Sequence, residues 1–546
     1  MTDSIPAEHR LPTHDVANQP AVAGDRDLWA PDVALREAVA LGGGDPAVLA
    51  VQGAVLGRAD VAEAARAANR VLPELRLFDR GGRRLDEVTF HPAYHDLLRL
   101  GLGAGYAALP WETAPSPVPG GHVSHAAMVY LHSQAEPGTC CPMTMTYAAI
   151  PALAAAPEVA DVWVPKLTSR DYDPSVRPVA DKRGATLGMA MTEKQGGSDL
   201  RQTITRAEAT ADGWRLWGHK WFCSAPMSDG FLTLAQTGKG LTCFLVPRWL
   251  AGERNAIHLM RLKDKLGNRA NASAEIEYHG ALANLIGDEG RGIATILTMV
   301  HHTRLDTAMA PAGLMRAALA EAMHWVANRT AFQRRLIDQP LMRAVLADLA
   351  LDWEGAVALG FRVAQAFDGA AEADRAFARI SVALAKFLAN KRCIPVVAEA
   401  MEALGGMGYV EDTRLPLLYR EAPLNGIWEG SGNVICLDIL RTLAKEPLAA
   451  ETLAAELDAA KGTDRRYDTA LSDARARWPG AVPEAEARAF AERMATLLTA
   501  AQLIRHAPAP VAEGYVLARL GREGGLIHAT AGGLDTGAIL NRLAPG

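Results

Sequence analysis

The sequence predicts an α+β protein of several domains, in which a β domain lies between two helical regions and a further helical domain follows. Three observations lead to this fold class: strand-forming segments replace helical ones near residue 184, long helical segments follow the strands, and the composition changes again beyond residue 445. We therefore expect an N-terminal α-helical domain (1–183), a central β domain (184–286), a helix bundle (287–445) and a C-terminal helical extension (446–546).

The N-terminal region is expected to be helical because short segments rich in Ala and Leu run through residues 32–155. Pro/Gly breaks such as Pro115–Gly121 separate these segments. The β domain then opens with TITRAEATADGWRLWGHKWF (Thr203–Phe222), which predicts two strands joined at Asp212-Gly213, a favoured hairpin turn. FLTLAQTG, LTCFLVPRWL and ASAEIEYHG continue the short-strand pattern.

Three long helices are predicted after the strands, in Ile293–Asn328, Pro340–Asp368 and Ala371–Leu404. Helices of such length are typical of an up-and-down bundle. Beyond Lys445 the chain is rich in Ala and Arg and is interrupted by Pro and Gly residues. This composition predicts a helical C-terminal extension.

The composition is that of an ordinary globular protein, with 22% charged and 49% hydrophobic residues among 546. A formal charge of −6 excludes a protein that is basic overall, so that any nucleic-acid contact must be local. No apolar run reaches the ~18 residues needed to span a bilayer, and the N-terminus lacks the pattern of a signal peptide. Six cysteines without CxxC spacing predict reduced thiols and a cytoplasmic location.

The stretch MTEKQGGSD (Met191–Asp199) stands where the strands begin. Thr192 and Ser198 offer hydroxyls, and Gly196-Gly197 lets a ligand approach the backbone closely. The stretch has neither the Gly-Lys-Ser/Thr of a phosphate-binding loop nor a GxGxxG pattern. From these residues alone, a ligand-binding loop and a tight turn at a domain edge both remain open.

Two further patterns argue against a metal site and against a serine-hydrolase site. His301-His302 are neighbours on a predicted helix, where side chains point about 100° apart, and no further ligand stands at a suitable spacing. We expect no metal site there, because a zinc site needs three or four converging ligands. The chain also lacks the GxSxG turn of a serine hydrolase.

The stretch GIWEGSGNVICLDILR (Gly426–Arg441) places Glu429 between an aromatic residue and a glycine. A glutamate on a solvated helix face usually has other polar residues around it, whereas the next acid here is Asp438, beyond an apolar run. Poor solvation raises the pKa of a carboxyl group and makes it a better base near neutral pH. From these residues alone, Glu429 is either a structural oddity or a general base held in a dry pocket.

Taken together, these stretches resemble the signatures of the acyl-CoA dehydrogenase flavoprotein family. AMTEKQGGSD is similar to its first signature, and GIWEGSGNVICLDILR to its catalytic segment. RTAFQ, at Arg329, resembles the Arg-x-x-Phe stretch that reaches the flavin of a neighbouring subunit, and EALGGMGYVED the glycine-rich stretch before the catalytic segment. The resemblance implies an acyl-CoA dehydrogenase-like fold, bound FAD and a homotetramer.

One branch of that family, the AidB proteins of the bacterial response to DNA alkylation, is more similar still. THDVANQP, FHPAYH, RLKDKLGNRANAS, EAMEALGGMGY and IWEGSGN resemble that branch, over residues 13 to about 441. Four positions depart from the general family pattern, and they favour a reading with reduced acyl-CoA turnover: Gln202, Glu402, Leu417 and Trp428.

The resemblance assigns roles to individual residues. Glu429 takes the role of the catalytic base, and Thr303 stands where branched-chain members carry their glutamate. Arg304 is expected to contact CoA or another anionic ligand, and Arg329 to reach the flavin pyrophosphate across a subunit contact. The remaining residues expected at the flavin are Met189, Ala190, Met191, Thr192, Gly196, Gly197, Ser198, Phe222, Cys223, Ser224, Ile427, Trp428, Gly430, Ser431, Gly432 and Asn433.

Two functions follow from the resemblance, beside a third possibility, a structural homologue that keeps FAD only for stability. The first is α,β-dehydrogenation of a short or branched acyl-CoA, with electrons passed to an electron-transfer flavoprotein. The alternative is a flavin-bearing protein that protects DNA and has little acyl-CoA turnover. Both predict bound FAD and no membrane partner.

DNA binding would depend on the C-terminal extension, which from Glu451 onwards holds eleven basic and twelve acidic residues. A uniformly basic face is therefore excluded, but a local arginine cluster that pairs with phosphates is not. A solvated helix face with alternating charges is the other reading of the same residues. The candidate DNA contacts are Arg441, Arg465, Arg466, Arg475 and Arg477.

Overall fold

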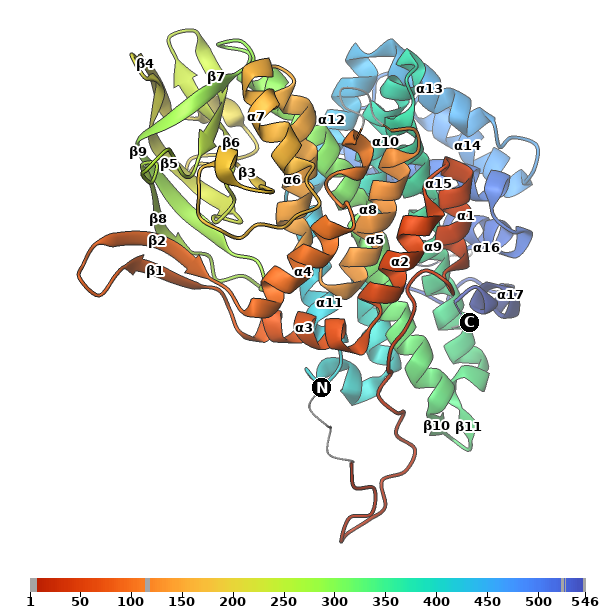
Figure 1. Cartoon of the computed structure of the whole chain (residues 1–546). Helices are drawn as coiled ribbons and strands as arrows, with labels where there is room; N and C mark the ends of the chain where they lie inside the picture. The colour runs from red at the N-terminus through yellow and green to blue at the C-terminus, as the bar shows by residue number, and fades with distance from the viewer. Residues whose placement is uncertain (1–6, 113–117, 522–524, 526, 544–546) are drawn as a thin grey trace.

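A computed structural model of the chain describes residues 7–112, 118–521, 525 and 527–543. The β domain lies on one side of a large block of helices, and the N-terminal and C-terminal helices pack against the long helices of that block (Figure 1). The α+β fold class predicted from the sequence is confirmed.

The N-terminal region is largely helical, but it also contains a β-hairpin that the sequence analysis did not predict. β1 (Glu74–Phe78) pairs with β2 (Arg84–Thr89) in antiparallel register. Asp79 closes the turn by accepting hydrogen bonds from two backbone N–H groups at 2.8 and 2.9 Å, and Gly82 supplies a φ of +79°. Part of the predicted Pro/Gly break at 115–121 lies outside the described residues.

The described part of the N-terminal region holds both α-helices and short 3-10 helices. They are α1 (Val33–Gly42), α2 (Pro46–Leu56), α3 (Ala59–Arg70), α4 (Pro92–Gly103), α5 (Gly121–Ala135), α6 (Cys140–Leu153) and α7 (Pro157–Leu167), with the 3-10 helices η1 (Leu109–Trp111) and η2 (Val179–Asp181).

The β domain is a closed sheet. β7 pairs with both β6 and β9, so that the order β6-β4-β5-β9-β7 returns to β6; β3 joins β6 in parallel and β8 pairs with β9. The predicted hairpin is confirmed, because Thr210 pairs with Gly213, which has a φ of +120°. The strands are β3 (Leu187–Ala190), β4 (Arg206–Thr210), β5 (Gly213–Ser224), β6 (Gly230–Thr237), β7 (Gly240–Pro247), β8 (Ile257–Leu262) and β9 (Ser273–Ile286), and η3 (Leu200–Gln202) precedes β4.

Three long helices form the centre of the molecule, as predicted. α8 (Gly292–Asn328), α9 (Pro340–Asp368) and α10 (Glu372–Ala403) pack on one another, and α8 also packs against α5 and α6. Between α8 and α9 the chain makes a small hairpin, β10 (Thr330–Ala331) and β11 (Arg334–Arg335), followed by η4 (Leu336–Asp338).

The rest of the chain covers one side of this bundle. Its elements are η5 (Gly405–Tyr409), α11 (Leu415–Glu421), η6 (Leu424–Gly426), α12 (Gly432–Lys445), α13 (Pro447–Asp458), α14 (Arg465–Arg477), η7 (Glu484–Glu486), α15 (Ala487–His506), α16 (Ala509–Leu520) and α17 (Thr536–Asn541).

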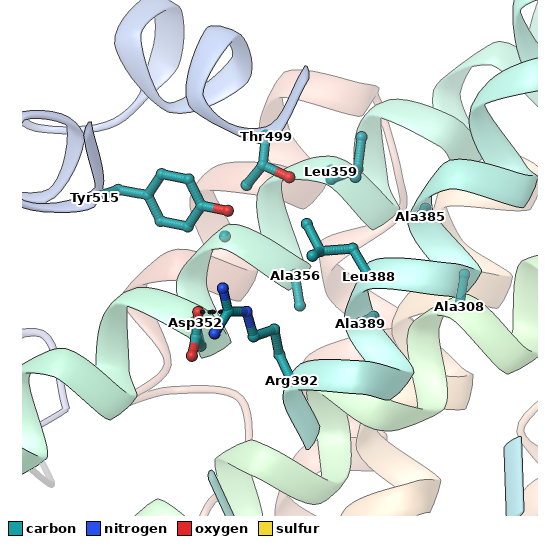
Figure 2. Close-up of a pocket in the computed structure, with 11 residues that line it drawn as sticks. Ala308, Asp352, Ala356, Leu359, Ala385, Leu388, Ala389, Arg392, Thr499 and Tyr515 are labelled. Atoms are coloured by element: carbon teal, nitrogen blue, oxygen red, sulfur yellow. Dashed lines mark ion pairs between the residues drawn. The ribbon is translucent and has the colours of Figure 1, made fainter. Parts of the chain in front are cut away.

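An ion cluster joins the C-terminal extension to the bundle. The Asp352 carboxylate on α9 accepts hydrogen bonds from Arg519 Nε at 2.8 Å and from His528 Nε2 at 3.0 Å. Figure 2 shows Asp352 facing Arg392 of α10, with Thr499 and Tyr515 of the extension close by. Asp352, Arg519 and His528 are thus buried where two parts of the chain meet, with Arg392 partly buried beside them.

No helix among the described residues is both long enough and apolar enough to cross a bilayer.

Candidate active site

Glu429 lies on a tight turn between η6 and α12. Its φ is +58° and that of Gly430 is +103°, so two consecutive residues adopt left-handed conformations. For a residue with a Cβ this conformation costs roughly 1–2 kcal/mol, and contacts elsewhere must compensate for it. The glycine removes that cost at the second position.

The Glu429 carboxylate meets a hydroxyl on α8. Thr303 Oγ1 donates to Glu429 Oε2 over 2.8 Å, and Thr303 itself is buried. Burial raises the pKa of Glu429, while the Thr303 hydroxyl and the charges of Lys386 and Arg304 lower it to a smaller degree. A carboxyl group with a raised pKa suits proton transfer at neutral pH.

Two buried cations hold the backbone of this turn. Lys386 Nζ, on α10, donates to the carbonyl oxygens of Asn425, Trp428 and Gly430 at 2.6, 2.9 and 3.2 Å. Arg304 Nε donates to the carbonyl of Glu429 at 3.2 Å. The sequence analysis missed Lys386; the available signal was one lysine within the apolar run VALAKFLA of a predicted helix.

The Arg304 guanidinium also forms an ion pair with Asp438 on α12. Nη1 lies 2.6 Å from Asp438 Oδ2, and Arg379 binds the same carboxylate through two nitrogens. Burial raises the pKa of Asp438, but the two guanidinium groups outweigh it and bring the pKa to about 2. These contacts make Arg304 a support of the catalytic turn; its contact with a ligand stays a prediction.

The stretch that resembles the first flavin signature begins at the end of β3, where the chain leaves the closed sheet. Its buried residue Glu193 accepts hydrogen bonds from the backbone N–H groups of Ile204 and Thr205, and Lys220 Nζ lies 2.7 Å from its Oε1. Burial raises the pKa of Glu193, but Lys220 and the hydrogen bonds lower it to about 2. The ion pair fixes the loop that presents Thr192 and Ser198.

The second predicted flavin stretch is the end of β5. The Phe222 side chain is 47% exposed, whereas Cys223 is fully buried in the core of the sheet. Alternate residues of a strand face opposite sides, so any contact of Cys223 with a flavin on the Phe222 side would be through its backbone; its place at the flavin stays a prediction. Ser224 Oγ lies 3.2 Å from Ser273 Oγ on β9.

A buried amide beside Ser224 lacks partners. Asn271 is 1% exposed, and neither its Nδ2 nor its Oδ1 has a hydrogen-bond partner among the described residues. Lys265 Nζ binds the Asn271 carbonyl at 2.7 Å and Ser273 Oγ at 3.2 Å. Buried polar atoms in native proteins are nearly always satisfied, so the two unpaired atoms of Asn271 fit a polar ligand at this position.

The glycines of the first stretch also fit a flat ligand. A Cβ on Gly197 would lie 2.8 Å from Thr192 Cγ2, so a side chain there would displace the predicted ring contact. Together with the exposed Phe222 and the unpaired Asn271 amide, these features fit a bound isoalloxazine ring. Of the stretch 427–433, Ile427 is 64% exposed, and Asn433 Oδ1 accepts from Arg488 Nη1 at 2.9 Å.

Arg329 is not brought to this site within one chain. It follows the end of α8, 26 positions beyond Thr303, which at ~1.5 Å per residue is roughly 40 Å away. Figure 1 places the adjoining hairpin β10–β11 at the end of the bundle far from the β domain. Arg329 Nη1 donates to the carbonyl of Asn18 at 2.7 Å.

Most of the candidate DNA contacts have carboxylate partners. Arg466 pairs with Asp464 at 2.6 Å, Arg475 with Asp458 at 3.0 Å and Arg477 with Glu486 at 2.9 Å. Arg441 lies 4.0 Å from Asp438, and Arg465 is exposed at the start of α14. The positive charge of this cluster is thus largely neutralised within the chain.

Two cavities lie at the junction with the C-terminal extension, and neither includes Glu429. One is bounded by α8, α9, α10, α15 and α16 and appears in Figure 2. The other lies between α1, α9 and α15.

Comparison with known proteins matches three parts of the chain to family models. Residues 18–174 match the family model of the adaptive response protein AidB N-terminal domain, 188–281 the acyl-CoA dehydrogenase middle domain and 290–444 the acyl-CoA dehydrogenase C-terminal domain. Escherichia coli AidB is 46% identical over 522 residues, which cover 94% of this chain and 96% of that protein.

Relatives from animals and solved structures agree with this match. The Caenorhabditis elegans acyl-CoA dehydrogenase family member 11 is 33% identical over 70% of this chain and 64% of its own length. The crystal structure of Caenorhabditis elegans ACDH-11 in complex with C11-CoA superposes with a TM-score of 0.82 at 28% identity, covering 96% of both chains. The chain therefore belongs to the acyl-CoA dehydrogenase family, within its AidB branch, and is an FAD-dependent oxidoreductase that acts on CH–CH groups.

Proposed function

We propose that this protein dehydrogenates the α,β bond of a short or branched acyl-CoA, with Glu429 as the base. The α-proton passes to the Glu429 carboxylate, the β-hydrogen leaves with its electron pair, and a C=C bond forms. Bound FAD supplies the hydride acceptor. The observation that carries the proposal is a partly buried carboxylate of raised pKa, held on a fixed turn against the Thr303 hydroxyl.

The residues around the base have different roles. The Thr303 hydroxyl orients the carboxylate, and Lys386 and Arg304 fix its backbone. The loop that Glu193 anchors, the Ser224 hydroxyl and the Asn271 amide would hold the ring of FAD. Holding base and acceptor in one geometry is what makes the proton and hydride transfers fast.

Anaerobic reduction of the flavin by a panel of acyl-CoA thioesters tests this proposal. The wild-type flavin should lose its yellow colour with at least one short or branched member; the panel includes a C11 thioester because ACDH-11 was solved with C11-CoA. Glu429→Gln should keep the flavin and the melting temperature but reduce the rate at least 10²-fold, on the order of what a general base contributes. Unchanged kinetics in that variant would exclude Glu429 as the base.

The assembly and electron transfer belong to the same proposal. We infer a homotetramer in which Arg329 of one subunit neutralises the FAD pyrophosphate bound by another, since its own chain leaves it far from Glu429. An electron-transfer flavoprotein would reoxidise the enzyme, and the location would be cytoplasmic. Arg329→Ala should weaken FAD retention and oligomerisation together, measured by gel filtration with absorbance at the flavin band.

A second function, binding of duplex DNA in the response to alkylation, is proposed from the similarity to the AidB branch. The ion pairs of Arg466, Arg475 and Arg477 argue for weak binding, because a phosphate must compete with their carboxylates. Mobility shifts of duplex DNA at increasing salt test it, since each phosphate contact steepens the salt dependence.

The variants for that test replace matched sets of arginines with Ala. Changing Arg465, Arg466, Arg475 and Arg477 should flatten the salt dependence and leave the flavin spectrum intact. The control set carries the same charge on exposed, carboxylate-paired arginines elsewhere: Arg58, Arg66, Arg76 and Arg206. Absence of any shift by the wild type at about 50 mM salt, where such contacts are strong, would rule the DNA role out.

A further inference from the structure

Lys386 is a buried cation whose hydrogen-bond partners are backbone carbonyls. Its side chain is 1% exposed in the middle of α10, and its three N–H bonds are matched by three carbonyl oxygens of the turn 425–430. Among the residues that the structure describes, no carboxylate lies within 4.0 Å of its nitrogen. Buried lysines elsewhere in the chain, such as Lys182 and Lys220, form close ion pairs.

Such a cation is costly to keep. Taking an ammonium group out of water without a counter-ion disfavours its charged form, and burial lowers the pKa of Lys386 to about 7. Glu429 is the group that opposes this shift, whereas Arg304 on α8 and Lys391 on α10 add to it. An apolar residue would avoid that cost, so the charge has a use at this position.

The carbonyls that Lys386 binds flank the candidate base. Trp428 precedes Glu429 and Gly430 follows it, and both carbonyls accept from the same nitrogen. Arg304 binds the carbonyl in between. Every carbonyl from 428 to 430 therefore accepts from a buried cation, which holds Glu429 at its unfavourable φ of +58°.

We propose that Lys386 is the positioning residue of the catalytic turn: its ammonium group fixes the backbone around Glu429 and supplies the positive charge that favours the carboxylate form. The proposal rests on the proposed role of Glu429 as base. A neutral residue at 386 would remove both effects, whereas another cation would remove only the three-way geometry.

The test measures Glu429 in the FAD-loaded protein without substrate. Infrared difference spectra against Glu429→Gln report the protonated carboxyl group as a function of pH, and hydrogen–deuterium exchange reports the mobility of the peptide 424–434. In Lys386→Met the titration midpoint of Glu429 should rise by about one unit or more, the usual effect of losing a nearby opposite charge. Exchange in the peptide should become faster.

Lys386→Arg separates the effect of charge from that of geometry, and Lys182→Met serves as the control. Lys386→Arg should leave the midpoint close to that of the wild type while exchange remains faster, because a guanidinium cannot place one nitrogen against three carbonyls. Lys182→Met removes a buried lysine that pairs with Asp229 at 2.6 Å, and it should destabilise the protein without changing either measurement on Glu429. Should Lys386→Met fail to fold, Lys386→Gln replaces it, since its amide keeps N–H donors without charge.

The outcomes of these measurements test the role of Lys386 separately from the proposed function. An unchanged Glu429 midpoint and unchanged exchange in the folded neutral variant overturn the role of Lys386. If no acyl-CoA reduces the wild-type flavin, the proposed function fails, yet the titration and the exchange still decide whether Lys386 positions the turn. If an acyl-CoA does reduce the wild-type flavin, Lys386→Met should make flavin reduction slower and move the acid limb of its pH profile to higher pH. Lys386→Arg should restore the position of the acid limb.

Discussion

A single hydroxyl serves both protonation states of Glu429. Thr303 Oγ1 lies 2.8 Å from the carboxylate and 3.0 Å from the carbonyl of Val300. It donates to Glu429 when that group is ionised; when Glu429 has taken a proton, the hydroxyl accepts from it and donates to Val300 instead. The base is therefore satisfied before and after proton transfer.

Removing this hydroxyl should shift the pH dependence of flavin reduction. A hydrogen bond to a charged group is worth about 1.5–3 kcal/mol and one to a neutral group about 0.5–1.5, so Thr303→Val destabilises the carboxylate more than the acid. The Glu429 pKa then rises by about one unit. Because the base must be ionised to react, the acid limb of the rate profile should move to higher pH.

Thr307→Val is the matched control. Thr307 is buried one turn further along α8 and donates to the carbonyl of Arg304 at 3.2 Å, without contact to Glu429. The same group is deleted from the same helix, so general destabilisation should be similar and the acid limb should stay in place. A shift of equal size in both variants would contradict the role assigned to Thr303.

The sequence predicted the candidate base but not its supports. Glu429 was identified from its neighbours along the chain, whereas its supports come from distant helices: Arg304 binds its carbonyl and Lys386 binds the carbonyls on either side of it. The burial of the Cys223 side chain was not predicted for a related reason, because the face of a strand that meets the core depends on the bulge between Lys220 and Cys223. Such contacts are set by tertiary packing.

At the scale of elements, long periodic helices were the easiest to predict. The bounds expected for α9 agree with the structure. The expected start of α8 and both expected ends of α10 differ from the structure by one residue each. The hairpin β1–β2 was missed because its strands are short and lie in a region with a helical pattern, and because RLDEVT carries charged residues on both faces, which weakens its alternation.

The Glu193–Lys220 pair anchors the element expected to hold the flavin. Glu193→Gln leaves the buried Lys220 without its anion, which for a buried pair costs about 3–5 kcal/mol, and it loosens the loop 191–205. We expect a lower melting temperature and weaker FAD retention, measured by flavin release on dilution. Glu208→Gln, in an exposed pair with Arg206 at 3.1 Å, should change neither.

The same pair predicts how stability depends on acid. The folded pKa of Glu193 is lowered to about 2 from 4.5, so its contribution is fully present above pH 4.5 and is lost as the pH falls toward 2. Urea denaturation at several pH values should therefore show a smaller loss between pH 5 and about 3 for Glu193→Gln than for the wild type. Equal losses would contradict the assignment.

At the scale of the whole molecule, buried charges attach the C-terminal extension to the bundle. Asp352 on α9 meets Arg519 of α16 and His528, both from the extension, and Asp348 pairs with Arg519 at 2.6 Å. At the other end Arg542 binds Glu354 of α9 and Glu37 of α1. The extension thereby links the N-terminal helices to the bundle, an arrangement that composition alone did not reveal.

Asp352→Asn should detach the extension before it unfolds the flavin site. Burial raises the pKa of Asp352, but Arg519, His528 and Arg392 outweigh it and hold the pKa well below its usual value. Neutralising Asp352 leaves Arg392 and His528 without their anion, although Arg519 keeps Asp348. We expect a loss of about 3 kcal/mol, the lower end for a broken buried pair.

Limited proteolysis with flavin absorbance as a second readout measures this. Cleavage within 509–543 should become much faster in Asp352→Asn while the bound flavin is retained, because Glu429 and the barrel lie outside the cluster. Asp458→Asn is the control: its partners Lys461 and Arg475 are exposed, and such pairs contribute about 0–1 kcal/mol. Loss of flavin at the same rate as cleavage would show that the extension and the catalytic bundle unfold as one unit.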